Sequence, residues 1–315
     1  MRNLFQIVVM ALLVMNFAEA QIPPSITYDS LSGDWIVTYQ GSEGPIEAYF
    51  VPATKIHPTV RASIGETGDT LLYRYTLTNE ALSQQRLINF RVSLHSTVLN
   101  DTRPNSQWRS RHSDLVNGWY WGHTLVNADG GPGSDMGVPA DSSVGGFSIQ
   151  SFGLPAIVNS YFQGLTGTVT FVESPPKEVY DLLRPLRAFP INEVLRRAVA
   201  PADPPTPFNG LGFLDTIKSY VNESRTLNWI TTQATANKYT ALIDSAKANL
   251  AAIPPQRGIA KAKLDSVLVN VYPDSAAGLL TSEAYALLRF NTEYVMKKLR
   301  VEDSDHQEEG KTKPR

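Results

Sequence analysis

The sequence predicts a multi-domain α and β protein: an N-terminal antiparallel β-sandwich of immunoglobulin-like architecture, followed by a small C-terminal bundle of α-helices. Apolar residues recur every second position from Trp35 to Val172, which is typical of strands with one buried face. After Gly212 they recur with the period of 3.6 residues that marks amphipathic helices. Prolines crowd the stretch between these two regions, where no long regular element is expected.

Residues 1–20 have the pattern of a cleavable secretion signal. Arg2 supplies the positive end, residues 7–15 form an apolar core, and Ala18-Glu19-Ala20 is the small-x-small pattern that a signal peptidase accepts. The apolar run is shorter than the ~20 residues that a transmembrane helix needs. We therefore expect cleavage before Gln21, no transmembrane anchor afterwards, and a secreted or periplasmic location.

The β-sandwich is predicted over residues 21–173. Residues 71–78 and 88–94 each alternate apolar and polar side chains and are separated by a polar turn, which predicts an antiparallel pair. Glycine- and aspartate-rich breaks separate the other candidate strands. These are residues 35–39, 46–51, 59–64, 118–126, 147–152 and 167–172.

Residues 174–209 are predicted to be a proline-rich linker with one short helix near 191–199, because proline fixes φ and withholds a backbone donor. Few contacts are expected to cross such a linker, so the parts on either side are predicted to fold independently.

Four amphipathic helices with short connections are predicted over residues 210–300. Their apolar stripes begin at Leu214, Tyr239, Ala260 and Ala284. Thr281 is the expected N-cap of the last helix, with Glu283 in its first turn, where a carboxylate meets the positive end of the helix dipole. Residues 301–315 are polar throughout and are expected to be disordered.

The helical segment resembles the FIMAH-type domain found near the C-termini of secreted bacterial proteins. The resemblance runs from Phe213 to Leu299 and is carried by "LNWITTQATANKYTALIDSAKANL" and "LLTSEAYALLRFNTEYVMKKL". The sequence departs from the family at Ala234, where glycine is usual, at Tyr239, where leucine is usual, and at "IPPQRG", which replaces a Gly-Asn turn. The resemblance implies an accessory or interaction module that contributes no catalytic residues. The matching positions are Ile230, Ala236, Asn237, Ile243, Ala246, Leu250, Leu280, Thr281, Ala284 and Leu288.

Composition narrows the range of functions. The formal net charge of -2 argues against a nucleic-acid partner, because phosphate binding needs a concentrated positive field. The chain has no cysteine, which removes disulfides, thiol catalysis and thiolate metal sites, and which fits an exported bacterial protein. The hydrophobic fraction of 42% is enough for a packed core.

A catalytic site is considered at His112, Asp114 and His123, beside Ser113, because a base with an orienting carboxylate can activate a serine. No G-x-S-x-G nucleophile elbow is present, and the histidine spacing does not match a zinc motif. Histidines in a polar loop are more often surface residues, so we expect the protein not to be an enzyme. An extracellular hydrolase with a site unrecognised in the sequence remains an alternative.

A calcium site is considered at Asp129, Asp135 and Asp141, because calcium prefers clustered oxygens on a bendable loop. Their spacing is not that of an EF-hand, and aspartate and glycine are also the usual residues of turns. We therefore expect no cofactor, with calcium as the alternative.

Trp108, Trp119 and Trp121 are the remaining candidates, close in sequence to Arg109 and Arg111. Exposed aromatic rings would stack on sugars and form a glycan-binding surface. On a strand, however, Trp119 and Trp121 point to one face, and large aromatic side chains are usually buried. We expect both to fill the core.

Together these patterns predict an exported, non-enzymatic protein. Its β-sandwich recognises or displays something, its helices form an accessory module, and its partner is an extracellular protein or glycan. A carbohydrate-binding protein that uses the three tryptophans is the first alternative, and an extracellular hydrolase is the second.

Overall fold

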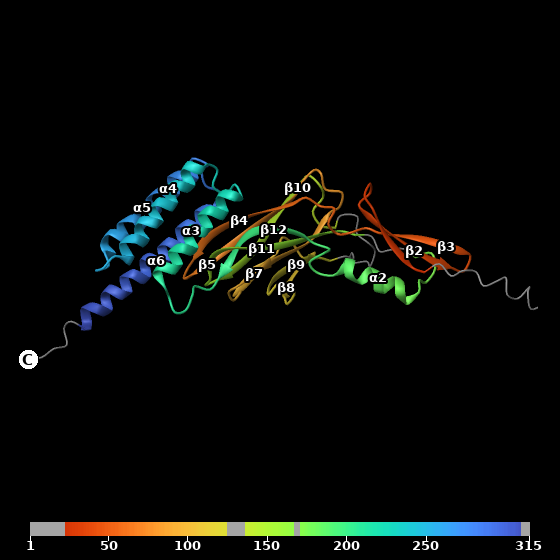
Figure 1. The fold of residues 1–315 in the computed structure, drawn as a ribbon, viewed down its shortest axis with the longest axis horizontal. Helices are drawn as coiled ribbons and strands as arrows, with labels where there is room; N and C mark the ends of the chain where they lie inside the picture. The colour runs from red at the N-terminus through yellow and green to blue at the C-terminus, as the bar shows by residue number, and fades with distance from the viewer. Residues whose placement is uncertain (1–22, 125–135, 167–170, 310–315) are drawn as a thin grey trace, which may run out of the picture. The chain divides into compact units, whose positions relative to one another are not determined.

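The computed structural model describes residues 23–124, 136–166 and 171–309 (Figure 1). Within these ranges it contains three antiparallel sheets and five helices, so the predicted mixture of α and β structure, mostly β in the N-terminal part, is confirmed. Backbone proximity divides the chain into two compact units. Unit 1 comprises residues 1–55 and 165–193, and unit 2 comprises residues 56–164 and 194–315.

Unit 1 is a three-stranded sheet with a helix, α2 (Lys177–Arg187), packed on one face. Every second residue of the sheet faces the helix, so alternation alone creates this small core. Its strands are β1 (Ser25–Asp29), β2 (Asp34–Gly41) and β3 (Gly44–Phe50), in that order. The buried residues are Val37, Tyr39, Ala48, Phe50, Val179 and Leu183.

Unit 2 contains the other two sheets. The first has the order β4-β5-β10-β7 and the second the order β12-β11-β6-β9-β8. The first sheet consists of β4 (Pro58–Thr67), β5 (Thr70–Asn79), β10 (Ser142–Ser151) and β7 (Asn100–Thr102). The second consists of β12 (Val194–Ala202), β11 (Leu154–Gly164), β6 (Leu87–Ser93), β9 (Gly118–His123) and β8 (Trp108–Ser113).

The two sheets of unit 2 pack against each other through aromatic side chains. The ring of Tyr75 on β5 lies 5.6 Å from that of Phe90 on β6, measured between ring centres. The ring of Phe147 on β10 lies 5.8 Å from that of Trp121 on β9. All four side chains are buried, which makes this layer the centre of the core.

The predicted pairing of residues 71–78 with 88–94 is wrong. These segments form β5 and β6, which lie in different sheets and meet through side chains rather than backbone hydrogen bonds. β5 pairs with β4 and β10, whereas β6 pairs with β11 and β9. Alternation identifies a strand with one buried face, but it does not identify the strand beside it.

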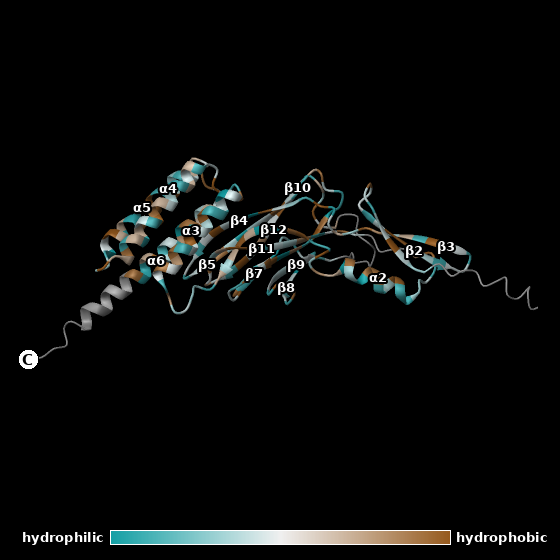
Figure 2. Cartoon of the chain, in the orientation of Figure 1, coloured by the Kyte–Doolittle hydropathy of each residue, from teal (hydrophilic) through white to brown (hydrophobic). Residues whose placement is uncertain are grey.

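Four helices complete unit 2. α3 packs on α4, α4 on α5 and α5 on α6, and α3 also contacts α6. Hydrophobic and hydrophilic residues are interleaved along them, as amphipathic helices require (Figure 2). No helix in the described ranges is both long and apolar enough to cross a membrane. Their bounds are α3 (Gly210–Thr226), α4 (Gln233–Ala251), α5 (Arg257–Ala276) and α6 (Ser282–Glu309).

Capping residues set where two of these helices begin. The side chain of Asn209 accepts a hydrogen bond from the backbone N–H of Gly212 at the start of α3 (3.1 Å). The hydroxyl of Thr232 accepts one from the backbone N–H of Thr235 at the start of α4 (3.1 Å). The C-terminal end of α6 differs from the prediction, since the helix continues to Glu309 instead of ending near residue 300. Extending an existing helix costs no new nucleation, so a polar sequence can continue it.

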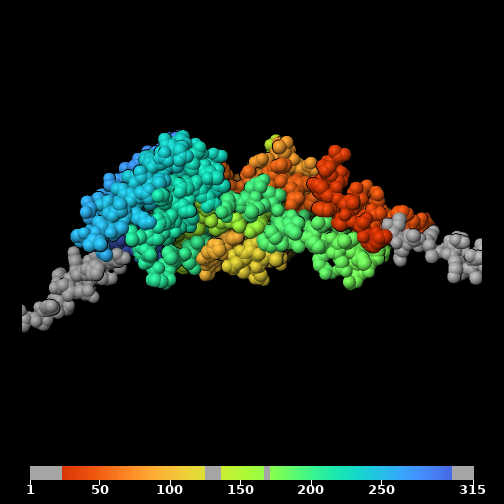
Figure 3. Space-filling view, in the orientation of Figure 1, coloured from red at the N-terminus to blue at the C-terminus, as the bar shows by residue number. Residues whose placement is uncertain are grey.

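α6 is joined to the sheets by buried polar contacts. The carboxylate of Glu283 accepts a hydrogen bond from the backbone N–H of Ala62 on β4 (2.7 Å). The hydroxyl of Ser282 donates to the carbonyl of Ala62 (2.7 Å), and the amide of Asn291 donates to the carbonyl of Pro155 (2.9 Å). Glu283 does lie in the first turn of α6, but its carboxylate binds the edge of a sheet. Figure 3 shows the surface of these helices, cyan to blue, continuous with that of the strands of unit 2.

The region predicted as a linker is largely ordered. Its helix is α2, at Lys177–Arg187, and the residues near 191–199 where a helix was expected form β12 instead. β12 pairs with β11, and its residues Ala198, Val199 and Ala200 are buried. Because β12 is the last strand of the sheet, it tolerates Pro201. The apolar run of β12 is too short for its period to distinguish a strand from a helix. It forms a strand because β11 supplies the hydrogen-bonding partner. The two compact units therefore do not follow the boundary predicted at residues 174–209.

This arrangement changes the expected result of limited proteolysis. Cleavage between Ala202 and Asn209 should leave the two fragments associated, because α6 and the sheets share one hydrophobic core. Size-exclusion chromatography of the nicked chain should give one peak containing both fragments. Separate elution of a folded helical fragment would instead support independent folding.

Candidate functional site

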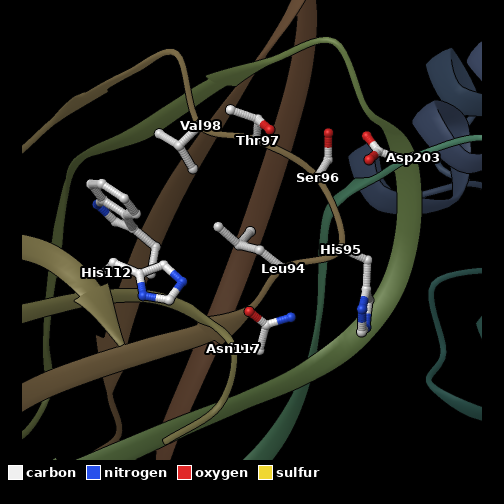
Figure 4. A pocket seen from close by; sticks show the side chains of 9 residues that line it. Leu94, His95, Ser96, Thr97, Val98, His112, Asn117 and Asp203 are labelled. Carbon is white, nitrogen blue, oxygen red and sulfur yellow. The ribbon is translucent and has the colours of Figure 1, made fainter. Parts of the chain in front are cut away.

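A surface pocket lies in unit 2, at the end of the five-stranded sheet where β6 ends and β9 begins. Its volume is about 450 Å³. It is lined by Leu94, His95, Ser96, Thr97, Val98, His112, Asn117, Trp119 and Asp203 (Figure 4). We call it the Trp119 pocket.

After β6 the chain runs past the end of β11 to the end of β12, and this segment forms one side of the pocket. The backbone N–H of His95 donates to the carbonyl of Pro201 (3.2 Å), and the N–H of Asp203 donates to the carbonyl of His95 (2.8 Å). On the other side, the turn before β9 places Asn117 at a φ of 43°, a conformation that asparagine tolerates. Gly118 follows, and a Cβ there would lie 2.0 Å from the carbonyl oxygen of Val92. The close approach of β6 and β9 at this point therefore requires glycine.

Trp119 provides the aromatic wall. It points to the same face of β9 as Trp121, but it lies at the end of the core and is only half-buried. Its indole nitrogen Nε1 is buried, and no hydrogen-bond acceptor for it is present among the described residues. A buried donor without an acceptor costs about 1–3 kcal/mol.

Polar side chains surround this wall. No hydrogen bond or ion pair engages the side chains of His95, Thr97, Asn117 or Asp203 within the part of the chain that the structure describes. Figure 4 shows His112 and Asn117 on one side of the pocket and Ser96 and Asp203 on the other, with Leu94 between them. The pocket thus offers one aromatic ring, a small apolar floor, and several donors and acceptors that are exposed to solvent.

The structure separates the three tryptophans that the sequence grouped as a ligand surface. Trp121 is fully buried and Trp108 is 2% exposed, so neither presents a ring to a ligand. Trp121 is stacked on Phe90 with a ring-centre distance of 5.2 Å, and its indole donates to the carbonyl of Thr102 (3.1 Å). The expectation that Trp121 fills the core is confirmed. Trp119 is the member of the group that lines a pocket.

The proposed catalytic residues do not come together. His112 Nδ1 lies 3.2 Å from a carboxylate oxygen of Asp114, but both side chains are largely in solvent. Ser113 follows His112 on β8, so their side chains point to opposite faces. His123 is buried, with Nδ1 2.9 Å from the carbonyl oxygen of Thr124. Ser96, the serine of the pocket, lies across it from His112 in Figure 4 and hydrogen-bonds the hydroxyl of Ser151 (3.0 Å).

The calcium hypothesis concerns residues that lie mostly outside the described ranges. Asp129 and Asp135 fall there, whereas Asp141 lies in the turn before β10 with a φ of 55°. The described residues contain no group of three or more histidine, aspartate or glutamate side chains placed to hold a metal ion.

The chain matches no protein-family model and no curated protein sequence. The class of the protein is therefore described from its fold and its pocket. It is a mixed α and β protein with an open, polar surface pocket at the end of a sheet, walled on one side by a half-buried tryptophan.

Proposed function

We propose that the protein is an exported, non-enzymatic recognition protein whose β-rich part binds a carbohydrate in the Trp119 pocket. The observation that carries this proposal is the combination of one half-buried indole ring with the polar side chains of His95, Thr97, Asn117 and Asp203, which have no hydrogen-bond partner among the described residues. Of the three tryptophans that the sequence suggested as a glycan-binding surface, this proposal uses Trp119. The partner is thus a glycan rather than a protein.

A sugar has chemical groups that match both the indole ring and the polar side chains of this pocket. One face of a pyranose ring carries C–H groups that pack on an aromatic ring, and its rim carries hydroxyls that both donate and accept. The carboxylate of Asp203 supplies acceptors, and the amide of Asn117 supplies an acceptor and a donor. A volume of about 450 Å³ lies within the usual range for small-molecule sites.

The other parts of the molecule have supporting roles in this proposal. We regard the two facing sheets of unit 2 as an immunoglobulin-like sandwich and its four helices as a bundle. The helices correspond to the FIMAH-type accessory module that their sequence resembles. What supports the resemblance is that several matching apolar positions, among them Ile230, Ile243 and Ala246, are buried.

Asp203→Asn tests the proposal with little risk to the fold, since the side chain of Asp203 is exposed. Asparagine keeps an acceptor oxygen but loses the negative charge, and a charge-assisted hydrogen bond is roughly twice as strong as a neutral one, so the variant should bind its glycan about three- to tenfold more weakly. The expected ligand is first selected on a glycan array with the purified chain, and affinities are then measured by titration calorimetry.

Asp69→Asn is the matched control, because Asp69 is also an exposed aspartate of unit 2 but lies in the β4–β5 turn. It should bind as tightly as the unmodified chain. Trp119→Ala should abolish binding. Equal affinity in all variants, or the absence of any glycan ligand, would contradict the proposal, and turnover of an array glycan would favour the hydrolase.

A further inference from the structure

A second pocket of unit 2 lies where β4, β12 and the connection between α3 and α4 meet. Its volume is about 440 Å³, and it shares no residue with the Trp119 pocket. Val60, Glu80, Arg196, Leu227 and Trp229 are among the residues that line it. We call it the Val60 pocket, because the backbone of that residue gives it an open strand edge.

The outer edge of β4 is unpaired at Val60. Along an edge strand, the backbone groups of successive residues point alternately toward the neighbouring strand and away from it. The N–H and C=O of Ala62 point away, since they bind side chains of α6, and the C=O of Pro58 points away and accepts from Nε of Arg196 (3.0 Å). Val60 lies between them in the same phase. Its outward N–H and C=O have no hydrogen-bond partner among the described residues, so the pocket offers a free backbone donor and a free backbone acceptor.

Arg196 brings a guanidinium group without a carboxylate partner to this edge. Its Nε donates to the carbonyl of Pro58, and its Nη1 donates to the carbonyl of Leu195 (2.9 Å). These two bonds to the backbone fix the orientation of the group. Its second terminal nitrogen, Nη2, has no partner in the part of the chain that the structure describes, and it is therefore available to an acceptor in the pocket.

Glu80 brings a carboxylate to the same pocket. The residue is exposed, and no hydrogen bond or ion pair engages its side chain within the described ranges. The two other arginines of the pocket lie beside other carboxylates, since Arg61 is 3.6 Å from Glu283 and Arg197 is 2.9 Å from Glu223. Among its described residues, the pocket therefore holds one guanidinium and one carboxylate that have no ionic partner and do not pair with each other.

We infer that the Val60 pocket binds a free α-amino acid as its zwitterion. The ligand carboxylate accepts hydrogen bonds from the Val60 N–H and from Arg196, and the ligand ammonium donates to the Val60 C=O and to Glu80. Residues opposite each other in an antiparallel pair exchange the same two backbone bonds, so the ligand takes the place of a single strand neighbour. Charges on both ends of the ligand strengthen these bonds. Leu227 and Trp229 supply apolar surface, so we expect an aliphatic or aromatic side chain.

A longer peptide and an inorganic anion fit the pocket less well. The outward backbone groups on either side of Val60 are already bonded at Pro58 and Ala62, so an added strand would pair with one residue only. An anion such as phosphate would leave the carboxylate of Glu80 unpartnered and would place a like charge in the same pocket. A volume of about 440 Å³ lies within the usual range for small-molecule sites.

Titration calorimetry of the full chain with each of the twenty standard amino acids tests the inference and selects the tightest ligand. The N-acetyl and the carboxamide derivatives of that amino acid should each bind at least about tenfold more weakly, since acetylation removes the ammonium and amidation removes the carboxylate. This comparison uses the unmodified chain, so it does not depend on how any variant folds.

Arg196→Gln and Glu80→Gln should each weaken binding of the free amino acid about three- to tenfold, because glutamine keeps polar atoms but carries no charge. Arg74→Gln and Asp69→Asn are the matched controls and should bind as tightly as the unmodified chain. Arg74 and Asp69 are exposed residues of unit 2 that lie on β5 and in the β4–β5 turn, outside the pocket.

Asp203→Asn separates this site from the Trp119 pocket, and it should leave amino-acid binding unchanged. The inference would be overturned if none of the twenty amino acids bound, or if both derivatives bound as tightly as the free amino acid. Equal affinity in the two pocket variants and their controls would also overturn it, as would tighter binding of inorganic phosphate or of an alanine tripeptide than of every free amino acid.

Discussion

Replacement of Trp121 by alanine should lower the free energy of unfolding of unit 2 by about 3–5 kcal/mol. Trp121 is fully buried between the sheets, and its ring packs on Phe90, Tyr75 and Phe147. The substitution removes these contacts and leaves a cavity. It also leaves the carbonyl of Thr102 without the indole donor that it has in the native chain.

Urea denaturation followed by circular dichroism measures this effect. Tyr272→Ala is the control, because the side chain of Tyr272 on α5 is 73% exposed and should contribute little to stability. If Trp121→Ala unfolded at the same urea concentration as the control, Trp121 would not be part of a packed core. The description of the two facing sheets would then be wrong.

Removal of the Glu283 carboxylate should be the second large perturbation, with an expected loss of about 2–3 kcal/mol for Glu283→Ala. The side chain is 1% exposed and accepts the backbone N–H of Ala62, which would lose its partner in a buried position. Arg61 also lies 3.6 Å from this carboxylate, but the Arg61 side chain is 62% exposed, so that ion pair adds little. Glu283→Gln keeps an acceptor oxygen and should therefore lose much less stability than Glu283→Ala.

Glu293→Ala on the same helix is the matched control. Glu293 pairs with Arg289 one turn away, near the surface, and such pairs contribute about 0.3–0.5 kcal/mol. Denaturation curves give the size of each effect, and amide hydrogen exchange at Ala62 should accelerate only in Glu283→Ala. Equal stability of Glu283→Ala and Glu293→Ala would show that the contact between α6 and β4 does not stabilise the unit.

The candidate site was only partly visible in the sequence. Trp119 was identified as a member of a tryptophan group, but Trp108 and Trp121 belong to the core. Asn117 and Asp203 were not identified at all. Nothing local marks Asp203, because the crossing of the chain from β6 to the end of β12 brings it to the pocket. A turn asparagine before a glycine was the one sequence signal that could have indicated a close approach at this end of the sheet.

The sequence by itself determined the type of most elements. Period-two alternation marked strands such as β5 and β6, and the 3.6-residue stripes marked the helices after residue 210, because a hydrophobic period reflects which side of an element is buried. Strand partners, the strand β12, the attachment of α6 to β4 and the Trp119 pocket were decided by the tertiary structure. Each of these depends on contacts between residues far apart in the chain, as between Ala62 and Glu283 or between His95 and Asp203, and no local pattern encodes them.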